Sequence, residues 1–206
     1  MEKILSDGFA ALGITPDAEA VGRLQAYYEY LEERNKVMNL TAISGLEDVA
    51  RLHFLDCAAL LTVCDFADKK VIDVGTGAGF PGLVLKIVQP EMDITLLDSL
   101  NKRIDFLGEM SEKLELERIC CVHARAEEIP EERRAAYDIA VSRADCADEA
   151  AEAENAMHLL GARLEKIEHY AIPGTDITHA AVVIEKIKPT HPKYPRKWAQ
   201  IKKNPL

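Results

Sequence analysis

The chain has 206 residues, of which 48% are hydrophobic and 29% are charged, a composition typical of one globular domain with a sizeable core. No window approaches the ~20 consecutive apolar residues that a transmembrane helix needs. The apolar start of the chain is interrupted at Asp7 and Gly8 before a signal peptide could form, so we expect a cytoplasmic protein. The five cysteines are an odd set without a C-x-x-C pair, and we expect neither disulfides nor a metal site.

The net charge of −10 at pH 7 is distributed unevenly along the chain. Residues 1–185 contain 18 basic and 35 acidic residues, a net charge of about −17. Residues 186–206 contain no acidic residue and seven basic ones, namely Lys186, Lys188, Lys193, Arg196, Lys197, Lys202 and Lys203. We expect this basic tail to bind nucleic-acid phosphates, although a tail that serves only solubility is an alternative.

The pattern of apolar residues predicts helices first and then a sheet. Val21, Leu24, Tyr28 and Leu31 recur at helical spacing, and a second helix is expected over 46–63. From residue 70 onward, β-rich runs alternate with helical patterns, which predicts a parallel sheet with right-handed crossovers. The expected strands are 71–74, 94–97, 119–122 and 138–141, and the expected helices are 82–88, 102–114 and 131–136.

The end of the sheet pattern differs from its beginning. After a helix expected over 147–160, the strand-like runs 164–170 and 180–187 are separated only by the turn Pro173-Gly174. We expect an antiparallel pair that closes the edge of the sheet.

The most informative stretch is VIDVGTGAGFPG over 71–82, a predicted strand that leads into a glycine-rich turn and a helix. A dinucleotide fingerprint, G-x-G-x-x-G, would need a glycine at position 80, where the chain has Phe80, so a nicotinamide-dependent enzyme is disfavoured. The spacing acid-x-G-x-G-x-G, from Asp73 through Gly75 and Gly77 to Gly79, resembles the first motif of class I methyltransferases. A glycine-rich turn without a ligand is the alternative.

Two acidic positions follow the next strands. Asp98 ends the second expected strand, roughly 20 residues after the glycine turn, where a carboxylate can accept the hydroxyl hydrogens of a ribose. A helix cap is the other interpretation of Asp98. The segment Arg125-Ala126-Glu127-Glu128 after the third strand could contact an adenine ring, or its acids could simply begin a helix.

Three further stretches make the resemblance specific. NKVMNLTAI at 35–43, RLHFLDC at 51–57 and VSRA at 141–144, with the glycine turn and LDS at 97–99, are similar to the small-subunit (16S) ribosomal RNA guanine-N7 methyltransferases of the GidB (RsmG) family. The match covers nearly the whole chain in the right order. Departures from the family pattern are Cys57 for serine, Val84 for proline, and the segment WAQI at 198–201.

This resemblance implies a class I, Rossmann-like fold, S-adenosyl-L-methionine as cofactor, and methylation of one guanine in the 530 loop of the ribosomal RNA by a monomer. The parts would be an N-terminal helical segment over 1–66, the methyltransferase domain over 67–188 and the basic tail over 189–206. The cofactor contacts that we expect from the glycine pattern, the strand end and the resemblance are Gly75, Gly77, Gly79, Phe80, Asp98, Ala126, Glu127 and Arg143. A methyltransferase acting on another RNA or on a small molecule is the runner-up, and a non-enzymatic RNA-binding module would leave the glycine turn and Asp98 unexplained.

Methylation at guanine N7 has a simple chemical requirement. N7 carries a lone pair and no proton, so positioning should dominate and no general base is needed. We therefore expect no histidine to act as a base. His53 and Asp56, three residues apart on one helical face, could pair with each other or orient the target base, and Arg143 could bind the cofactor carboxylate or an RNA phosphate.

One part of the expected sheet is missing from the sequence. In a class I methyltransferase the fourth strand is followed by a helix and a fifth strand, whereas here Ala144 leads directly into a segment that resembles a later helix. The shortfall near 144–145 is roughly 25 residues. Either the protein has lost these elements, or the sequence omits a segment and its numbering closes over it. We favour omission, because loss of an interior strand would leave the terminal hairpin to pair with the fourth strand across an unfilled core.

Overall fold

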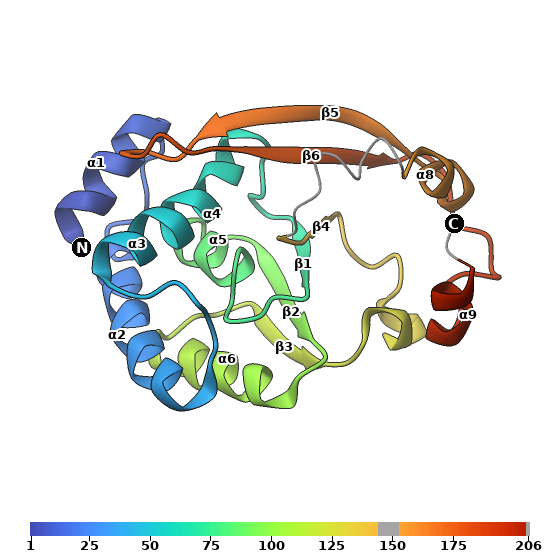
Figure 1. The fold of residues 1–206 in the computed structure, drawn as a ribbon, viewed down its shortest axis with the longest axis horizontal. Helices are drawn as coiled ribbons and strands as arrows, with labels where there is room; N and C mark the ends of the chain where they lie inside the picture. Colours follow the sequence, from blue (N-terminus) through green and yellow to red (C-terminus); the bar gives the residue numbers. More distant parts are fainter. Residues whose placement is uncertain (144–152, 205–206) are drawn as a thin grey trace. The chain divides into compact units, whose positions relative to one another are not determined.

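The computed structural model describes residues 1–143 and 153–204. The chain divides into two compact units, one of residues 1–143 with 172–177 and the other formed by the remaining residues (Figure 1). Among the described residues, no helix has the length and apolar content required to cross a membrane. Residues 144–152, where the sequence predicts the missing elements and the start of the helix 147–160, lie outside the described part.

The N-terminal part of the first unit is helical, as expected. Its elements are α1 (Glu2–Leu12), α2 (Ala20–Met38), α3 (Leu46–Val49), η1 (Ala50–Leu55), α4 (Asp56–Ala59) and η2 (Leu60–Thr62). The last four form one helical run over 46–62, with a π-helical segment at η1. On α2 the buried aromatic residue is Tyr27 and not Tyr28, because the buried stripe continues from Leu24 to Leu31 through position 27.

The parallel sheet of the first unit confirms the predicted strand and helix alternation. Its strands are β1 (Lys70–Val74), β2 (Asp93–Asp98), β3 (Ile119–His123) and β4 (Ile139–Val141), and its long helices are α5 (Gly82–Val88) and α6 (Asn101–Lys113). The strand order is β3-β2-β1-β4 and every pair is parallel. This is the order of the first four strands in a Rossmann sheet. Helices α5 and α6 pack against β2, and α2 packs against both helices.

The connection between β3 and β4 contains less helix than the sequence predicts. It contains only the 3₁₀ turns η3 (Ala126–Glu128) and η4 (Glu131–Arg133), so the helix expected over 131–136 is wrong. The backbone leaves the helical region at Arg134, which is extended with ψ of 140°, and Ala135 has a positive φ of 53° that an α-helix does not allow.

The second unit contains α8 (Glu154–Leu160), β5 (Ala162–Ala171), β6 (Thr178–Lys186) and α9 (Trp198–Lys203). Strands β5 and β6 are antiparallel, as predicted, with a register shift between Leu164 and Lys166. They form a two-stranded sheet of their own, so the expectation that the pair closes the edge of the main sheet is wrong for the described residues. The tight turn specifies the pairing of β5 with β6 locally, and no described strand connects this pair to β4.

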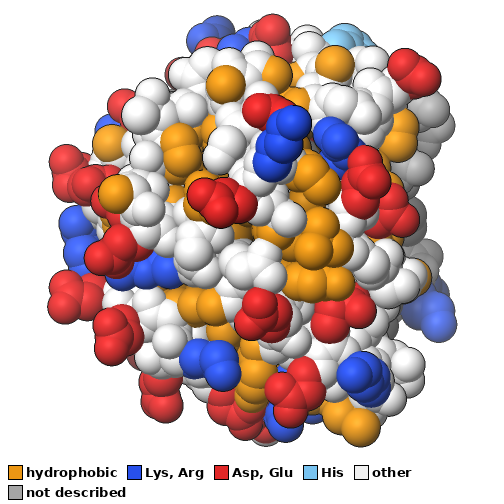
Figure 2. Space-filling view, turned by 90° about the vertical axis from the view of Figure 1, so that its left-hand side faces the viewer, with side chains coloured by type: hydrophobic (Ala, Val, Ile, Leu, Met, Phe, Trp, Pro, Cys, Tyr) orange, Lys and Arg blue, Asp and Glu red, His pale blue; other side chains and the backbone are white. Residues whose placement is uncertain are grey.

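The side of the molecule that carries α1 and α2 has a mixed surface. Acidic and basic side chains are interspersed there with hydrophobic ones (Figure 2). This face therefore differs from the basic tail, where the sequence contains lysine and arginine without acidic residues.

Two helical glycines provide a test of the packing between α1 and η1. A Cβ at Gly8 would lie 2.2 Å from Leu55 Cδ1, and Leu55 is fully buried, whereas a Cβ at the exposed Gly22 would meet nothing within 4 Å. We expect Gly8→Ala to lower the free energy of unfolding by about 1–3 kcal/mol through overpacking. Gly22→Ala should raise it by roughly 0.5–1 kcal/mol, because alanine is the better helix former. Urea denaturation of both variants measures the difference, and equal effects would contradict this packing.

Candidate functional site

The glycine-rich turn at the carboxyl end of β1 is pinned to the end of β2. The backbone N–H groups of Gly75 and Thr76 donate to Leu97 O at 2.8 and 3.0 Å. Gly75, Gly77 and Gly79 have positive φ angles of 75°, 61° and 106°, which side chains rarely adopt. The turn thus keeps its backbone open to a ligand at the carboxyl edge of the sheet, where ligands bind in folds of this class.

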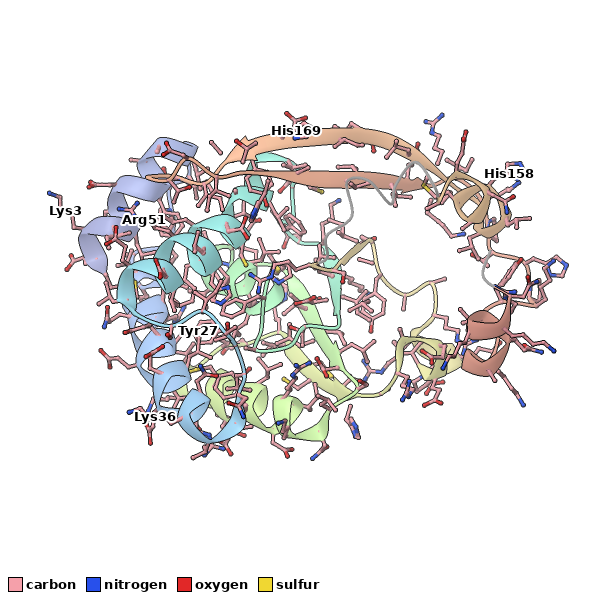
Figure 3. All side chains as sticks on the ribbon, viewed as in Figure 1. Lys3, Tyr27, Lys36, Arg51, His158 and His169 are labelled. Carbon is pink, nitrogen blue, oxygen red and sulfur yellow. The ribbon has the colours of Figure 1, made fainter. Side chains whose placement is uncertain are left out.

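Gly79 is also required for close packing. A Cβ at this position would lie 2.7 Å from the hydroxyl oxygen of Tyr27. Tyr27, labelled in Figure 3, is fully buried on α2 and donates a hydrogen bond to Ala78 O. Its ring stacks on Phe80 at 5.7 Å between centroids. Tyr27 thereby joins the N-terminal helices to the turn, a role that the helical periodicity of α2 alone did not indicate.

Asp73 closes the other end of the turn. This buried side chain on β1 accepts a hydrogen bond from Gly82 N at 2.8 Å, at the beginning of α5. Burial raises the pKa of Asp73 to about 6, and the nearby Thr76 hydroxyl and the hydrogen bond from Gly82 N reduce the shift. The motif contained this residue as its acid, but only the fold shows that the carboxylate binds the helix start.

Asp98 connects the turn to the second strand. Its Oδ2 accepts from Gly77 N at 2.9 Å and from Arg103 at 3.2 Å, and its Oδ1 accepts from Leu100 N at 2.9 Å. An ionised carboxylate offers about four lone-pair positions, so capacity for one further donor remains. The helix-cap interpretation and the ribose interpretation of Asp98 are therefore compatible.

A cavity opens beside Asp98 at the carboxyl edge of the sheet. Its lining comes from the ends of β1 and β2, from α6 and from the segment after β3: Val74, Gly75, Leu97, Asp98, Ser99, Arg103, Ala124, Arg125, Ala126 and Glu127. Glu127 Oε1 is buried and makes no hydrogen bond with the described residues, although Arg125 lies 3.9 Å away. The structure thus brings together four of the predicted cofactor residues, namely Gly75, Asp98, Ala126 and Glu127.

Two other predicted cofactor residues, Phe80 and Arg143, form a second group with His53. The imidazole of His53 stacks on Phe80 with 4.1 Å between centroids, and the guanidinium carbon of Arg143 lies 5.1 Å from the centre of the same ring. Arg143 donates to His53 Nδ1 at 2.9 Å, and Nε2 lies 2.8 Å from Thr41 Oγ1. Both ring nitrogens are therefore engaged by residues other than Asp56, which is buried on α4.

Electrostatics keep His53 and the neighbouring Cys57 uncharged at neutral pH. Burial, followed by the nearby Arg143, lowers the pKa of His53 to about 3. Burial likewise raises the pKa of the Cys57 thiol on the neighbouring helix α4. At neutral pH His53 is therefore a fixed neutral imidazole and a very weak base.

Asn35 fixes the segment that brings Thr41 to His53. Its Oδ1 accepts from Leu40 N at 2.6 Å and from Thr41 N at 3.0 Å, and its Nδ2 donates to Thr41 O at 2.9 Å. These residues belong to a stretch that carries the family resemblance, but the sequence indicated no individual role for them. A side-chain bridge over six residues depends on the left-handed turn at Asn39, with φ of 49°, which spacing alone does not predict.

In the second unit, the basic tail contains one lysine with a structural role. Lys186 Nζ donates to Leu160 O, to Lys188 O at 2.7 Å and to Thr190 Oγ1 at 2.6 Å. These bonds use all three N–H donors of the ammonium group. Arg196 donates one bond to Asn204 O at 2.8 Å, while Lys202 and Lys203 are exposed on α9.

The raised pKa of Asp73 predicts how stability changes with pH. Because the folded pKa of about 6 lies above the ordinary value of 3.8, the folded state favours the protonated acid, and its stability falls as pH rises toward and through 6. Asp73→Asn keeps an acceptor for Gly82 N and removes the titration. Relative to the wild type, its free energy of unfolding should increase by about 1–2 kcal/mol between pH 5 and 7.5. Urea denaturation at the two pH values tests this, and a constant difference would refute it.

Comparison with known proteins connects this geometry to a family. The family described as GidB, rRNA small subunit methyltransferase G, matches residues 21–170. The ribosomal RNA small subunit methyltransferase G of Acetivibrio thermocellus is 37% identical over 234 positions, which cover 100% of this chain and 97% of the relative. The protein of the same name from Alkaliphilus metalliredigens is 40% identical over 233 positions, covering 98% of each chain.

The similarity to one solved structure is lower. TrmN from Thermus thermophilus has a TM-score of 0.47 and 17% identity, covering 65% of this chain and 48% of its own. The assignment therefore depends on the sequence matches, which extend over most of the sheet and the N-terminal helices. The chain belongs to the GidB family of small-subunit ribosomal RNA methyltransferases.

Proposed function

We propose that this protein transfers a methyl group from S-adenosyl-L-methionine to N7 of a guanine in the 530 loop of small-subunit ribosomal RNA. The family match over 21–170 is the observation that carries the proposal. The activity would be that of a cytoplasmic monomer, with the methyltransferase domain over 67–188. The helices of 1–66 would hold the glycine turn in place through Tyr27 and His53.

The cavity beside Asp98 fits the adenosine part of this cofactor. Asp98 retains acceptor capacity for a ribose hydroxyl, and Glu127 Oε1 is a buried acceptor without a hydrogen bond from the described residues, suited to the amino group of adenine. The positive φ angles at Gly75 and Gly77 leave the backbone accessible beside that cavity. When bound, S-adenosyl-L-methionine supplies an electrophilic methyl group on a sulfonium sulfur.

The residues around His53 would position the guanine and not move protons. N7 of guanine has a lone pair and no hydrogen, so its methylation requires no general base. Alignment of reactants can supply roughly 7–11 kcal/mol of the barrier reduction. Arg143 could bind either the carboxylate of the cofactor or a phosphate of the RNA. It is exposed, and the hydrogen bond to His53 uses only one of its N–H donors.

The basic tail would provide contacts to the RNA backbone. Lys188, Lys193, Arg196, Lys197, Lys202 and Lys203 supply six cationic side chains, while Lys186 is the weakest of the seven candidates because its donors are already used. Phosphate contacts of this kind give affinity that falls with salt.

We also infer that a segment following β4 is missing relative to other family members. The 234 aligned positions with the Acetivibrio thermocellus protein exceed the 206 residues of this chain by 28, similar to the length of the helix and strand absent from the sequence pattern. Among the described strands, β4 pairs only with β1 and forms the edge of the sheet. An absent strand on the other side of β4 is consistent with this arrangement.

The proposed activity can be measured on small ribosomal subunits and their free RNA from cells that lack this methylation. We expect the protein to form one N7-methylguanosine in the 530 loop, mapped by mass spectrometry of RNA fragments. Asp98→Ala should weaken binding of S-adenosylhomocysteine by about 1.5–3 kcal/mol, the range for a hydrogen bond to a charged group. No N7-methylguanosine in either substrate would reject the proposal.

Asp93→Ala is the matched control for Asp98→Ala. Asp93 is an exposed carboxylate at the opposite end of the same strand, paired with Arg118 at 2.7 Å. This variant should bind S-adenosylhomocysteine as the wild type does. Thermal unfolding should verify that both variants are folded, since Asp98 also binds Gly77 N and Leu100 N.

The contribution of the tail can be measured from the salt dependence of RNA binding. The double variant Lys202→Gln/Lys203→Gln should reduce the slope of log K against log salt by roughly 0.7–0.9 for each RNA phosphate that the protein no longer neutralises. The double variant Lys3→Gln/Lys69→Gln makes the same charge change at exposed positions of the first unit and should leave the slope unchanged. Equal slopes for the two variants would place RNA binding away from α9.

A further inference from the structure

The hydrogen bonds around His53 determine which atoms carry hydrogens. Arg143 is always protonated and can only donate, so His53 Nδ1, 2.9 Å away, accepts. The neutral imidazole must then carry its hydrogen on Nε2 and donate it to Thr41 Oγ1 at 2.8 Å. The low pKa of His53, about 3, agrees with a neutral imidazole.

The same accounting defines the state of the Thr41 hydroxyl. Thr41 Oγ1 also accepts a hydrogen bond from Ile43 N at 3.1 Å. Both lone pairs of the oxygen are therefore used, and the hydroxyl can act only as a donor toward a further partner. Within the described part of the chain no hydrogen bond uses that hydrogen, and Thr41 is partly exposed.

The position of Thr41 is fixed and close to the glycine turn. Its backbone N–H and C=O are both bound by the Asn35 side chain. Its partner His53 stacks directly on Phe80, the residue that follows Gly79 in the turn. Arg143, the other partner of His53, lies two residues after the end of β4. The residue between them, Ser142, donates a hydrogen bond to Val74 O at 2.9 Å, at the end of β1. Thr41 thus holds a hydroxyl donor beside His53, which itself lies against the residue that follows the glycine turn.

Guanine offers a matching acceptor next to the atom that reacts. On the edge that contains N7, guanine has a second acceptor, O6, whereas adenine has an amino donor at the equivalent position. A hydroxyl that can only donate would bind guanine and would be left unpaired against adenine.

We propose that the Thr41 hydroxyl donates a hydrogen bond to O6 of the target guanine and thereby selects guanine. This inference rests on the proposed guanine-N7 activity and extends it to a specificity residue. Asn35 and His53 act as positioning residues for Thr41: Asn35 fixes its backbone, and His53 occupies one of its hydroxyl lone pairs so that the hydroxyl remains a donor.

A substrate series with two Thr41 variants tests the proposal. The target guanine is replaced by 2-aminopurine, which keeps N7 and the 2-amino group but lacks O6, in RNA joined from synthetic and transcribed fragments. For the wild type we expect kcat/KM to fall by about tenfold to a hundredfold on this replacement. Thr41→Val should show a similar loss on guanine RNA and little further loss, about threefold or less, on 2-aminopurine RNA.

Thr41→Ser is the matched control, because it keeps the hydroxyl, and it should discriminate between the two bases as the wild type does. The proposal is overturned if Thr41→Val and the 2-aminopurine replacement lower kcat/KM independently, so that their factors multiply. It is also overturned if Thr41→Val methylates guanine RNA with the wild-type kcat/KM. It is also overturned if Thr41→Val weakens S-adenosylhomocysteine binding as much as it lowers kcat/KM, since the hydroxyl would then serve the cofactor. Wild-type activity on guanine RNA separates these outcomes from failure of the proposed function.

Discussion

The binding of a glycine-rich backbone by two buried carboxylates is the interaction on which the rest of the site depends. Asp73 on β1 accepts from Gly82 N, and Asp98 at the end of β2 accepts from Gly77 N. A backbone with three positive φ angles has no regular hydrogen-bond ladder of its own, so its N–H groups need acceptors from elsewhere. The parallel pairing of β1 with β2 places both carboxylates at one edge, on either side of the turn.

The fixed turn determines where the N-terminal helices can contribute. Phe80 follows Gly79 and packs between Tyr27 of α2 and His53 of η1, so aromatic contacts connect the turn to two helices distant in sequence. The imidazole of His53 lies nearly parallel to the Phe80 ring, with an interplanar angle of 15°. Its nitrogens then face Thr41 and Arg143 as hydrogen-bond partners. The cavity beside Asp98 and the polar group around His53 are consequently separate features that share one structural support.

The sequence was sufficient for the parts of the site that depend on local pattern. The strand positions follow from runs of apolar residues, and the glycine spacing with Asp98 pointed to the carboxyl edge of the sheet, where the structure has a cavity. The bridges from Asn35 to Thr41 and from His53 to Arg143 join residues whose separation is set by a left-handed turn or by the whole sheet, so spacing could not reveal them. The hairpin was predicted as a pair, but its separation from the main sheet depends on which strand lies beside β4, a tertiary property.

The proposed methylation of guanine N7 moves no proton, and four groups near Phe80 keep a fixed protonation state around neutral pH. His53 stays neutral far below physiological pH, and burial raises the pKa values of Tyr27 and Cys57 away from neutrality. Arg143 is permanently cationic. Each of these groups therefore presents the same donors and acceptors throughout the physiological range, which suits the proposed recognition of guanine. Asp73, with a pKa near 6, differs from them, but its carboxylate is buried under the turn and bound to Gly82 N, where its titration affects stability and not base recognition.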